Sequence, residues 1–136
     1  MTDVMVQYDN SATGSCDIIY DIAGNLVYSG KIASDDAAED SQIRFYEGAT
    51  RIGLIRIIGD NIEWYDGSRI VVQAAVDNTI YHWALVFNID DDDVDIYING
   101  VYKQTESLEN NITTEIESVN WWTSQGDSGG TAYHSD

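Results

Sequence analysis

The sequence predicts an all-β fold, a two-sheet antiparallel β-sandwich, and three observations support this prediction. No segment of the 136 residues shows the apolar periodicity of a long helix. Clusters of Gly, Asn, Asp and Ser recur roughly every ten residues, which is the interval typical of sandwiches. The stretch 80–105 also holds two strongly patterned strand segments around an acidic connection. Together these features favour many short strands in two packed sheets.

The length and charge of the chain limit its organisation and its partners. A chain of 136 residues fits one domain, 1–136, which we interpret as a module or subunit of a larger assembly. Asp and Glu number 24 against six Lys and Arg, so the net charge is -18. A field of this sign repels phosphate backbones and anionic lipid, and it attracts divalent cations. No apolar run approaches the ~20 residues of a membrane span. We therefore expect neither nucleic acid nor membrane insertion.

Alternation and turn residues place the individual strands. The predicted strands lie at residues 4–8, 16–22, 26–32, 42–47, 50–58, 61–65, 69–76, 81–89, 94–98, 101–105, 116–124 and 131–134. Gly24-Asn25 is expected to turn the third strand back onto the second as a hairpin. Residues 34–41 are predicted as an acidic loop, and residues 106–115 as a long loop across the sandwich.

The stretch 80–105 is predicted to be the central hairpin region. One side of its first strand is apolar throughout, and we expect Trp83, Leu85 and Phe87 in the core, with Ile96 and Ile98 from the second strand. Asn99-Gly100 tolerates the positive φ angles of a two-residue turn, so residues 101–105 return as the next strand.

This stretch also resembles a known family. The segment 81–87 reads YHWALVF and the segment 94–101 reads VDIYINGV, with an acidic loop between them. The pair resembles the "W-H-x-V-A-V … D-x-Y-x-N-G" hairpin of laminin-G-like and concanavalin A-like jelly-roll domains. The resemblance implies a jelly roll. It leaves function broad, because these domains include glycan binders, calcium-dependent adhesion modules, glycan-cleaving enzymes and surface structural parts.

The four-aspartate run suggests a calcium site. Calcium takes six to eight oxygen ligands, and Asp90, Asp92, Asp93 and Asp95 supply carboxylates in one short segment. The spacing differs from that of a dedicated calcium loop, however. The alternative interpretation is a solvated hairpin loop that only improves solubility.

Adjacent aromatic pairs suggest a surface for stacking on sugar rings. In a strand, one member of Trp64-Tyr65 and one of Trp121-Trp122 must point away from the core. We predict a stacking surface formed by Trp64, Tyr97 and Trp122, and we include His82 among the ligand-binding residues. The alternative for His82 is a strand-face residue that makes an ordinary hydrogen bond. Packing in the core or at a subunit contact is the alternative for each aromatic.

The sequence predicts no catalytic residues. The segment 126–130 reads GDSGG, as in trypsin-like serine proteases, but the chain is too short for their double barrel and has no matching histidine and aspartate context. Glu115 and Glu117 alternate without the third acid found in glycan-cleaving jelly rolls. Cys16 is the only cysteine, so no internal disulfide forms.

These observations favour a non-catalytic recognition or adhesion module, located outside the cell or on a particle surface. Its expected partner is a glycan or surface polymer, with Ca²⁺ as a structural or bridging ion and protein partners in an oligomer or larger assembly. Two alternatives remain at this point. One is a structural subunit or decoration domain of a virion, filament or surface layer, and the other is a fragment of a polysaccharide-degrading enzyme.

Overall fold

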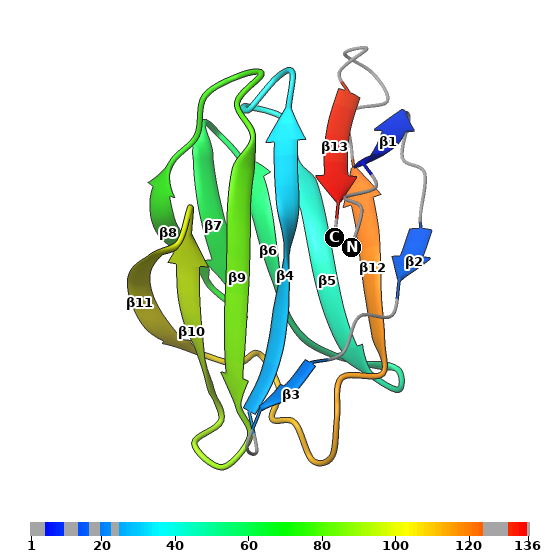
Figure 1. Ribbon diagram of the computed structural model, residues 1–136, viewed down its shortest axis with the longest axis vertical. Coiled ribbons are helices and arrows are strands. Elements are labelled where there is room, and N and C mark those ends of the chain that lie inside the picture. Colours follow the sequence, from blue (N-terminus) through cyan, green and yellow to red (C-terminus); the bar gives the residue numbers. More distant parts are fainter. Residues whose placement is uncertain (1–4, 10–13, 17–19, 23–24, 124–130, 136) are drawn as a thin grey trace.

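The computed structural model describes residues 5–9, 14–16, 20–22, 25–123 and 131–135, and the side chains of residues 26–121. Within these ranges the chain forms two antiparallel sheets and no helix. The sheets pack face to face as a sandwich (Figure 1). The predicted all-β, two-sheet antiparallel sandwich is confirmed. No helix in the described part of the chain is long and apolar enough to cross a membrane.

The first sheet has the strand order β1-β13-β4-β9-β10-β11, and β3 pairs with one end of β4. Its strands are β1 (Met5–Asp9), β3 (Tyr20–Ile22), β4 (Asn25–Ser34), β9 (Tyr81–Asn88), β10 (Asp93–Ile98), β11 (Val101–Ser107) and β13 (Thr131–Ser135). The predicted hairpin around residues 24–25 is confirmed, because Tyr20 of β3 pairs with Val27 of β4. The long strands β4 and β9 lie side by side at the centre of this sheet (Figure 1).

The second sheet has the strand order β2-β12-β5-β6-β7-β8. Its strands are β2 (Gly14–Cys16), β5 (Ser41–Glu47), β6 (Thr50–Ile58), β7 (Asn61–Tyr65), β8 (Arg69–Ala74) and β12 (Ser118–Thr123). From β5 to β8 each strand pairs with the next one in the sequence, through short turns. This meander brings side chains from four consecutive strands onto one continuous surface.

One strand prediction is wrong. Residues 16–22 were expected to form a single strand, but the structure has two short strands in different sheets. Cys16 of β2 pairs with Val119 in the second sheet, whereas Tyr20 of β3 pairs with Val27 in the first. A crossing between sheets leaves local β propensity unchanged, so the sequence pattern does not reveal it.

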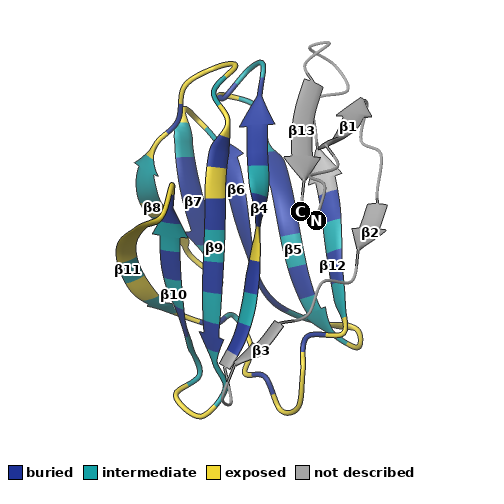
Figure 2. Ribbon diagram, in the orientation of Figure 1, coloured by how far each residue is buried: buried dark blue, intermediate teal, exposed yellow. Residues whose placement is uncertain are grey.

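The core lies between the sheets and follows the alternation of the strands. Trp83, Leu85, Phe87, Ile96 and Ile98 are all buried, as predicted. Alternating buried and more exposed bands along β9 are visible in Figure 2. The rings of the first sheet reach the second: Phe87 and Phe45 lie 5.3 Å apart between centroids. The stretch 80–105 therefore supplies much of one wall of the core.

The turn between β10 and β11 also agrees with the sequence. Asn99 and Gly100 have φ angles of 52° and 76°, both in the left-handed region that this dipeptide tolerates. The Asn99 side chain accepts a hydrogen bond from the His82 backbone N–H at 2.9 Å. This contact ties the turn to β9.

Candidate functional site

Two of the residues predicted to bind sugar lie on the outer face of β4, β9, β10 and β11. We call this surface the tyrosine face, and it comprises Ser29, Lys31, His82, Ala84, Tyr97 and Tyr102. The strand register aligns Ser29, Ala84, Tyr97 and Tyr102 across the four strands. His82 is exposed and Tyr97 is half-buried. Their surface position is as expected, and their contact with sugar stays a prediction.

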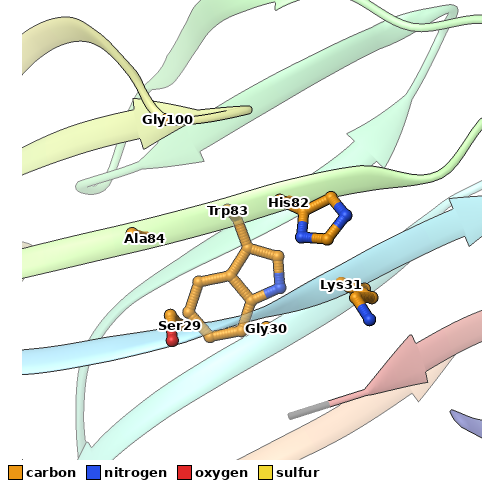
Figure 3. Close-up of a pocket in the computed structure, with 7 residues that line it drawn as sticks. All are labelled: Ser29, Gly30, Lys31, His82, Trp83, Ala84 and Gly100. Carbon is orange, nitrogen blue, oxygen red and sulfur yellow. The ribbon is translucent and has the colours of Figure 1, made fainter. Parts of the chain in front are cut away.

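A shallow hollow lies on the tyrosine face between β4 and β9 (Figure 3). Its volume is about 270 Å³, and it is lined by Ser29, Gly30, Lys31, His82, Trp83, Ala84 and Gly100. Four of these seven lining residues are small, namely Ser29, Gly30, Ala84 and Gly100. Lys31 and His82 lie on paired strands at one end of it, as Figure 3 shows. Tyr97 and Tyr102 form an edge-on aromatic pair beside it, with centroids 5.6 Å apart.

The prediction for Trp64 is wrong. Trp64 is fully buried, and its Nε1 donates a hydrogen bond of 2.9 Å to the Ser107 carbonyl oxygen. It therefore offers no ring face to a sugar. Gly53 on the paired strand β6 explains the inward orientation, because a Cβ there would lie only 2.6 Å from Trp64 Cη2. The absence of that side chain makes room for the indole, and Tyr65 points outward instead.

The third predicted stacking residue, Trp122, pairs through its backbone with Gln42 of β5. Its side chain lies outside the described residues. The neighbouring Trp121 is buried, with 5% of its surface exposed.

The aspartates of the predicted calcium loop make separate contacts. Asp92 accepts a hydrogen bond of 2.8 Å from Asn111, Asp93 accepts one from Asn88, and Asp95 accepts one from Thr105. Asp90 is exposed. Among the described residues, no three His, Cys, Asp or Glu side chains gather as a metal site. Calcium binding by Asp90, Asp92, Asp93 and Asp95 stays a prediction.

A second surface, which the sequence reasoning missed, lies on the outer face of β5 to β8. We call it the arginine face, and it comprises Gln42, Arg44, Arg51, Leu54, Arg56, Glu63, Tyr65 and Arg69. Along each strand these residues alternate with core residues, so they project away from the core. All four arginines of the chain belong to this surface, whereas both lysines lie on strands of the other sheet.

Leu54 occupies the centre of the arginine face. It pairs with Arg44 on one side and Tyr65 on the other. Only 2% of its surface is exposed, although it lies outside the contiguous core cluster, so longer neighbours bury it. A hollow of about 220 Å³ opens there, lined by Gln42, Arg44, Arg51, Leu54, Arg56 and Tyr65. Three guanidinium groups thus surround a small apolar floor.

Ion pairs hold two of the arginines against Glu63. The Glu63 side chain is 2% exposed, and Arg56 Nη2 lies 3.1 Å from its Oε2. Arg69 Nη2 donates to Glu63 Oε1 at 2.8 Å, with its Nε donating to Oε2 at 3.1 Å. Arg56 also lies 3.8 Å from Asp40. The charge on Glu63 is therefore compensated by two cations despite its burial.

The remaining two arginines are also fixed. Arg51 donates from Nε and Nη2 to the two oxygens of Glu109, at 2.6 and 2.8 Å. Arg44 donates from Nε to Gln42 Oε1 at 2.7 Å. Such forked pairs fix the plane of the guanidinium group as well as its position. The walls of the hollow are consequently held in place before any ligand arrives.

Tyr65 contributes an aromatic ring to the same hollow. The guanidinium carbons of Arg51 and Arg56 lie 5.3 and 5.5 Å from its ring centroid, within the range of cation–π contacts. The ring therefore joins the two ion-pair groups into one packed cluster.

Burial and hydrogen bonding shift several pKa values around the arginine face. Burial raises the pKa of Asp40, and a hydrogen bond from Gln42 and the charge of Arg56 oppose this shift. Hydrogen bonds to Glu109 and Glu63 raise the pKa of Arg51 and Arg69 respectively. The raised pKa values of Arg51 and Arg69 favour their charged forms further.

The sequence does contain a signal for this surface. The four arginines occur only between residues 44 and 69, and Arg44, Arg56 and Arg69 occupy alternating positions of predicted strands. Their common face depends on strand order and register, however. Those are long-range properties that periodicity alone does not supply.

Comparison with solved structures identifies the fold. No protein-family model and no curated protein matches the chain. A structure described as a sialidase has a TM-score of 0.77 at 13% identity, over 98% of this chain and 15% of that one. A Caenorhabditis elegans galectin, LEC-6, has a TM-score of 0.60 at 11% identity, over 95% of this chain and 93% of that one. A Bacillus licheniformis beta-glucanase has a TM-score of 0.61 at 14% identity, over 98% of this chain and 75% of that one.

These similarities show that the chain has a concanavalin A-like jelly-roll fold, as the resemblance of residues 81–101 predicts. The similar structures include galectin, glucanase and lyase domains, so the fold is one used by carbohydrate-binding and glycan-acting proteins. The chain spans only 15% of the sialidase structure. It spans 37% and 53% of two further similar structures, an HCR/D W1238A mutant and the catalytic domain of a glycoside hydrolase family 131 protein from Coprinopsis cinerea.

Proposed function

We propose that this chain is a non-catalytic glycan-recognition module that binds sugar in the hollow of the arginine face. The observation that carries the proposal is the hollow at Leu54, with guanidinium and amide groups around an apolar floor. Sugar sites need this combination, because a pyranose ring has apolar C–H surfaces and a rim of hydroxyls.

The chemistry of the lining suits a saccharide. The half-buried Tyr65 ring offers apolar contact, and the Gln42 amide and the guanidinium groups offer hydrogen bonds to hydroxyls. The ion pairs with Glu63 and Glu109 hold the arginines in position. Fixed side chains lose little conformational entropy on binding, which favours affinity. The volume of about 220 Å³ fits one sugar residue better than a long segment.

Two features support the non-catalytic part of the proposal. Glycosidases place two carboxylates on either side of the scissile bond, one as acid and one as base or nucleophile. The hollow is lined by no carboxylate. Glu63 lies 2% exposed beneath two arginines, where it is poorly placed to reach a substrate.

Filling the arginine-face hollow and the tyrosine-face hollow in turn tests which of them binds sugar. Leu54→Phe places a larger side chain in the arginine-face hollow, and Ala84→Phe does the same on the tyrosine face. Binding to a glycan array should identify oligosaccharides whose affinity falls at least about tenfold in Leu54→Phe, which corresponds to about 1.4 kcal/mol. Ala84→Phe should bind as the unmodified chain does. Thermal unfolding of both variants checks that each is folded.

The opposite pattern would place the site on the tyrosine face, where His82 and Tyr97 lie. Absence of binding to every glycan on the array would contradict the proposal. Release of reducing sugar or unsaturated product from a bound polysaccharide would overturn its non-catalytic part.

A further inference from the structure

The distribution of cations contrasts with the overall charge of the protein. The chain has a net charge of -18 and only six Lys and Arg residues. Four of those six are the arginines of the arginine face, and three of them, Arg44, Arg51 and Arg56, line one hollow of about 220 Å³. No carboxylate lines it. The hollow is therefore a locally cationic site in a strongly acidic molecule.

The acids near these arginines lie behind or beside them. Asp40, Glu63 and Glu109 each contact a guanidinium group, yet none of them is part of the lining.

The use of arginine alone indicates the geometry of the ligand. Both lysines lie on β4 and β11 of the other sheet. Arginine presents donors in a rigid planar fork that matches a carboxylate, whereas lysine acts as a flexible point charge. Within the described residues, Arg51 uses Nε and Nη2 for Glu109, and its Nη1 makes no hydrogen bond. The Nη1 N–H groups of Arg51 remain as donors for a ligand.

We propose that the arginine-face hollow binds a saccharide through a carboxylate group on the sugar, as in a uronic or sialic acid residue. This inference rests on the proposed function and specifies the class of its ligand. Arg44 and Arg51 meet the carboxylate, Gln42 meets a hydroxyl, and the Tyr65 ring contacts the apolar side of the sugar. The field of the distant acids does not prevent this, because at physiological ionic strength it is screened over about 8 Å.

Paired ligands test the role of the carboxylate. We would measure calorimetric affinities for oligosaccharides that contain uronic or sialic acids, each beside its methyl ester. Esterification removes the charge and keeps the sugar. The free acid is expected to bind at least about tenfold more tightly than the ester, a difference of about 1.4 kcal/mol. Sulfated oligosaccharides of equal length form a third arm, and they should bind more weakly than the acids.

Variants locate the interaction. Arg44→Gln should remove most of the preference for acid over ester, and Arg44→Lys should retain only part of it, because lysine keeps the charge without the fork. Lys103→Gln removes one positive charge from β11 on the other sheet, and it should leave the preference unchanged. Thermal unfolding confirms that each variant is folded before its affinity is compared.

The outcomes separate this inference from the proposed function. If the acid and the ester bound equally well, and Leu54→Phe abolished the binding of both, recognition of the carboxylate would be contradicted. Glycan binding in the arginine-face hollow would still be supported. Equal binding of sulfated and carboxylated sugars would show that charge alone is recognised, which would also contradict recognition of the carboxylate. If Lys103→Gln and Arg44→Gln reduced the preference for acid over ester equally, the binding site would not be on the arginine face. Binding of no saccharide would overturn both.

Discussion

The two outer faces of the sandwich bury their side chains in different ways. On β9, beneath the tyrosine face, buried residues alternate regularly with more exposed ones. On β6, beneath the arginine face, six consecutive residues from Ile52 to Ile57 are buried. The alternation of β6 is interrupted, because Phe45 pairs with Gly53 and Tyr46 with Arg51, so that Ile52 is an extra residue, and it also lies in the core. The rest of the difference arises because the long side chains of the arginine face bury the outward-pointing Leu54 and Arg56, whereas on the tyrosine face Ser29 is exposed and Ala84 is half-buried.

This contrast shows that a surface layer of a sandwich can become a second packed layer when its charges are paired. The arginine face is held by ion pairs and by the stacking of Arg51 and Arg56 on Tyr65. The tyrosine face has one aromatic pair and scattered hydrogen bonds. Substitutions on the two faces should therefore differ in their effect on stability.

Removal of Glu63 should give the largest effect. Glu63→Ala leaves the Arg56 side chain, which is 10% exposed, without its closest carboxylate. Asp40, 3.8 Å from Arg56, is then its remaining carboxylate. Breaking a buried pair by removing one partner costs about 3–5 kcal/mol, measurable as a loss in the free energy of unfolding in urea. Asp95→Ala on the tyrosine face removes a carboxylate that only accepts a hydrogen bond from Thr105, so it should cost about 1 kcal/mol or less.

Replacement of both partners sharpens this test. The double variant Arg56→Met and Glu63→Met removes the buried pair and fills its volume, so it should recover most of the stability that Glu63→Ala loses. Arg69 then loses its partner, but its side chain is 56% exposed and water can solvate it. Equal losses from Glu63→Ala and Asp95→Ala would contradict the distinction between the two faces.

Overpacking beneath the arginine face should give an intermediate effect. Gly53→Ala places a Cβ against the indole of Trp64, which must move or force β6 outward. Overpacking of this kind costs about 1–3 kcal/mol in the free energy of unfolding. Ala84→Ser also adds one heavy atom, but on the open tyrosine face, and it should stay within about 0.5 kcal/mol. If Trp64→Phe made Gly53→Ala no less costly, contact with the indole would not be the cause.

The smallest effect on stability should come from replacing Glu47, which lies at the end of β5 and binds the loop before β12. Hydrogen bonds from the backbone N–H of Thr113 and the hydroxyl of Thr114, together with further bonds from the same two residues, lower the pKa of Glu47 from 4.5 to about 2. A lowered pKa contributes stability above pH 4.5, and this contribution disappears as pH falls toward 2.

Unfolding measured from pH 7 to pH 2 in the unmodified chain and in Glu47→Gln tests this contribution. The stability difference between the two should be constant above about pH 5 and should shrink as pH falls through the interval from 4.5 to 2. Glu115→Gln makes the same change at an exposed position nearby, and its difference should be smaller at neutral pH. A Glu47→Gln difference that did not vary with pH would show that the charge is unimportant.

The predicted parts of the fold depend on local patterns. Alternation in β9 and β10 placed Trp83, Leu85, Phe87, Ile96 and Ile98 in the core, where the structure has them. Asn99-Gly100 predicted the turn between β10 and β11, and both residues have positive φ. These features follow from the two-residue period of a strand and from the steric limits on φ, so neighbouring residues are enough to infer them.

The candidate sites were only partly predictable. His82 and Tyr97 lie on an outer face of the first sheet, but Trp64, which was expected to share a stacking surface with them, lies on β7 of the second sheet with its side chain buried. Alternation predicts that one member of the Trp64-Tyr65 pair points outward without saying which one. The choice depends on Gly53, eleven residues earlier in the sequence, because β6 and β7 are paired and only a glycine leaves room for the indole.

By itself, the sequence determined the all-β class, the positions of most strands, the core of the central hairpin and the resemblance to concanavalin A-like domains. Tertiary structure decided that residues 16–22 divide between two sheets, and that Arg44, Arg51 and Arg56 meet around Leu54. The physical reason is the range of the interactions. Periodicity and turn chemistry act between neighbours, whereas strand order, register and the pairing of charges join residues that only the folded chain brings together.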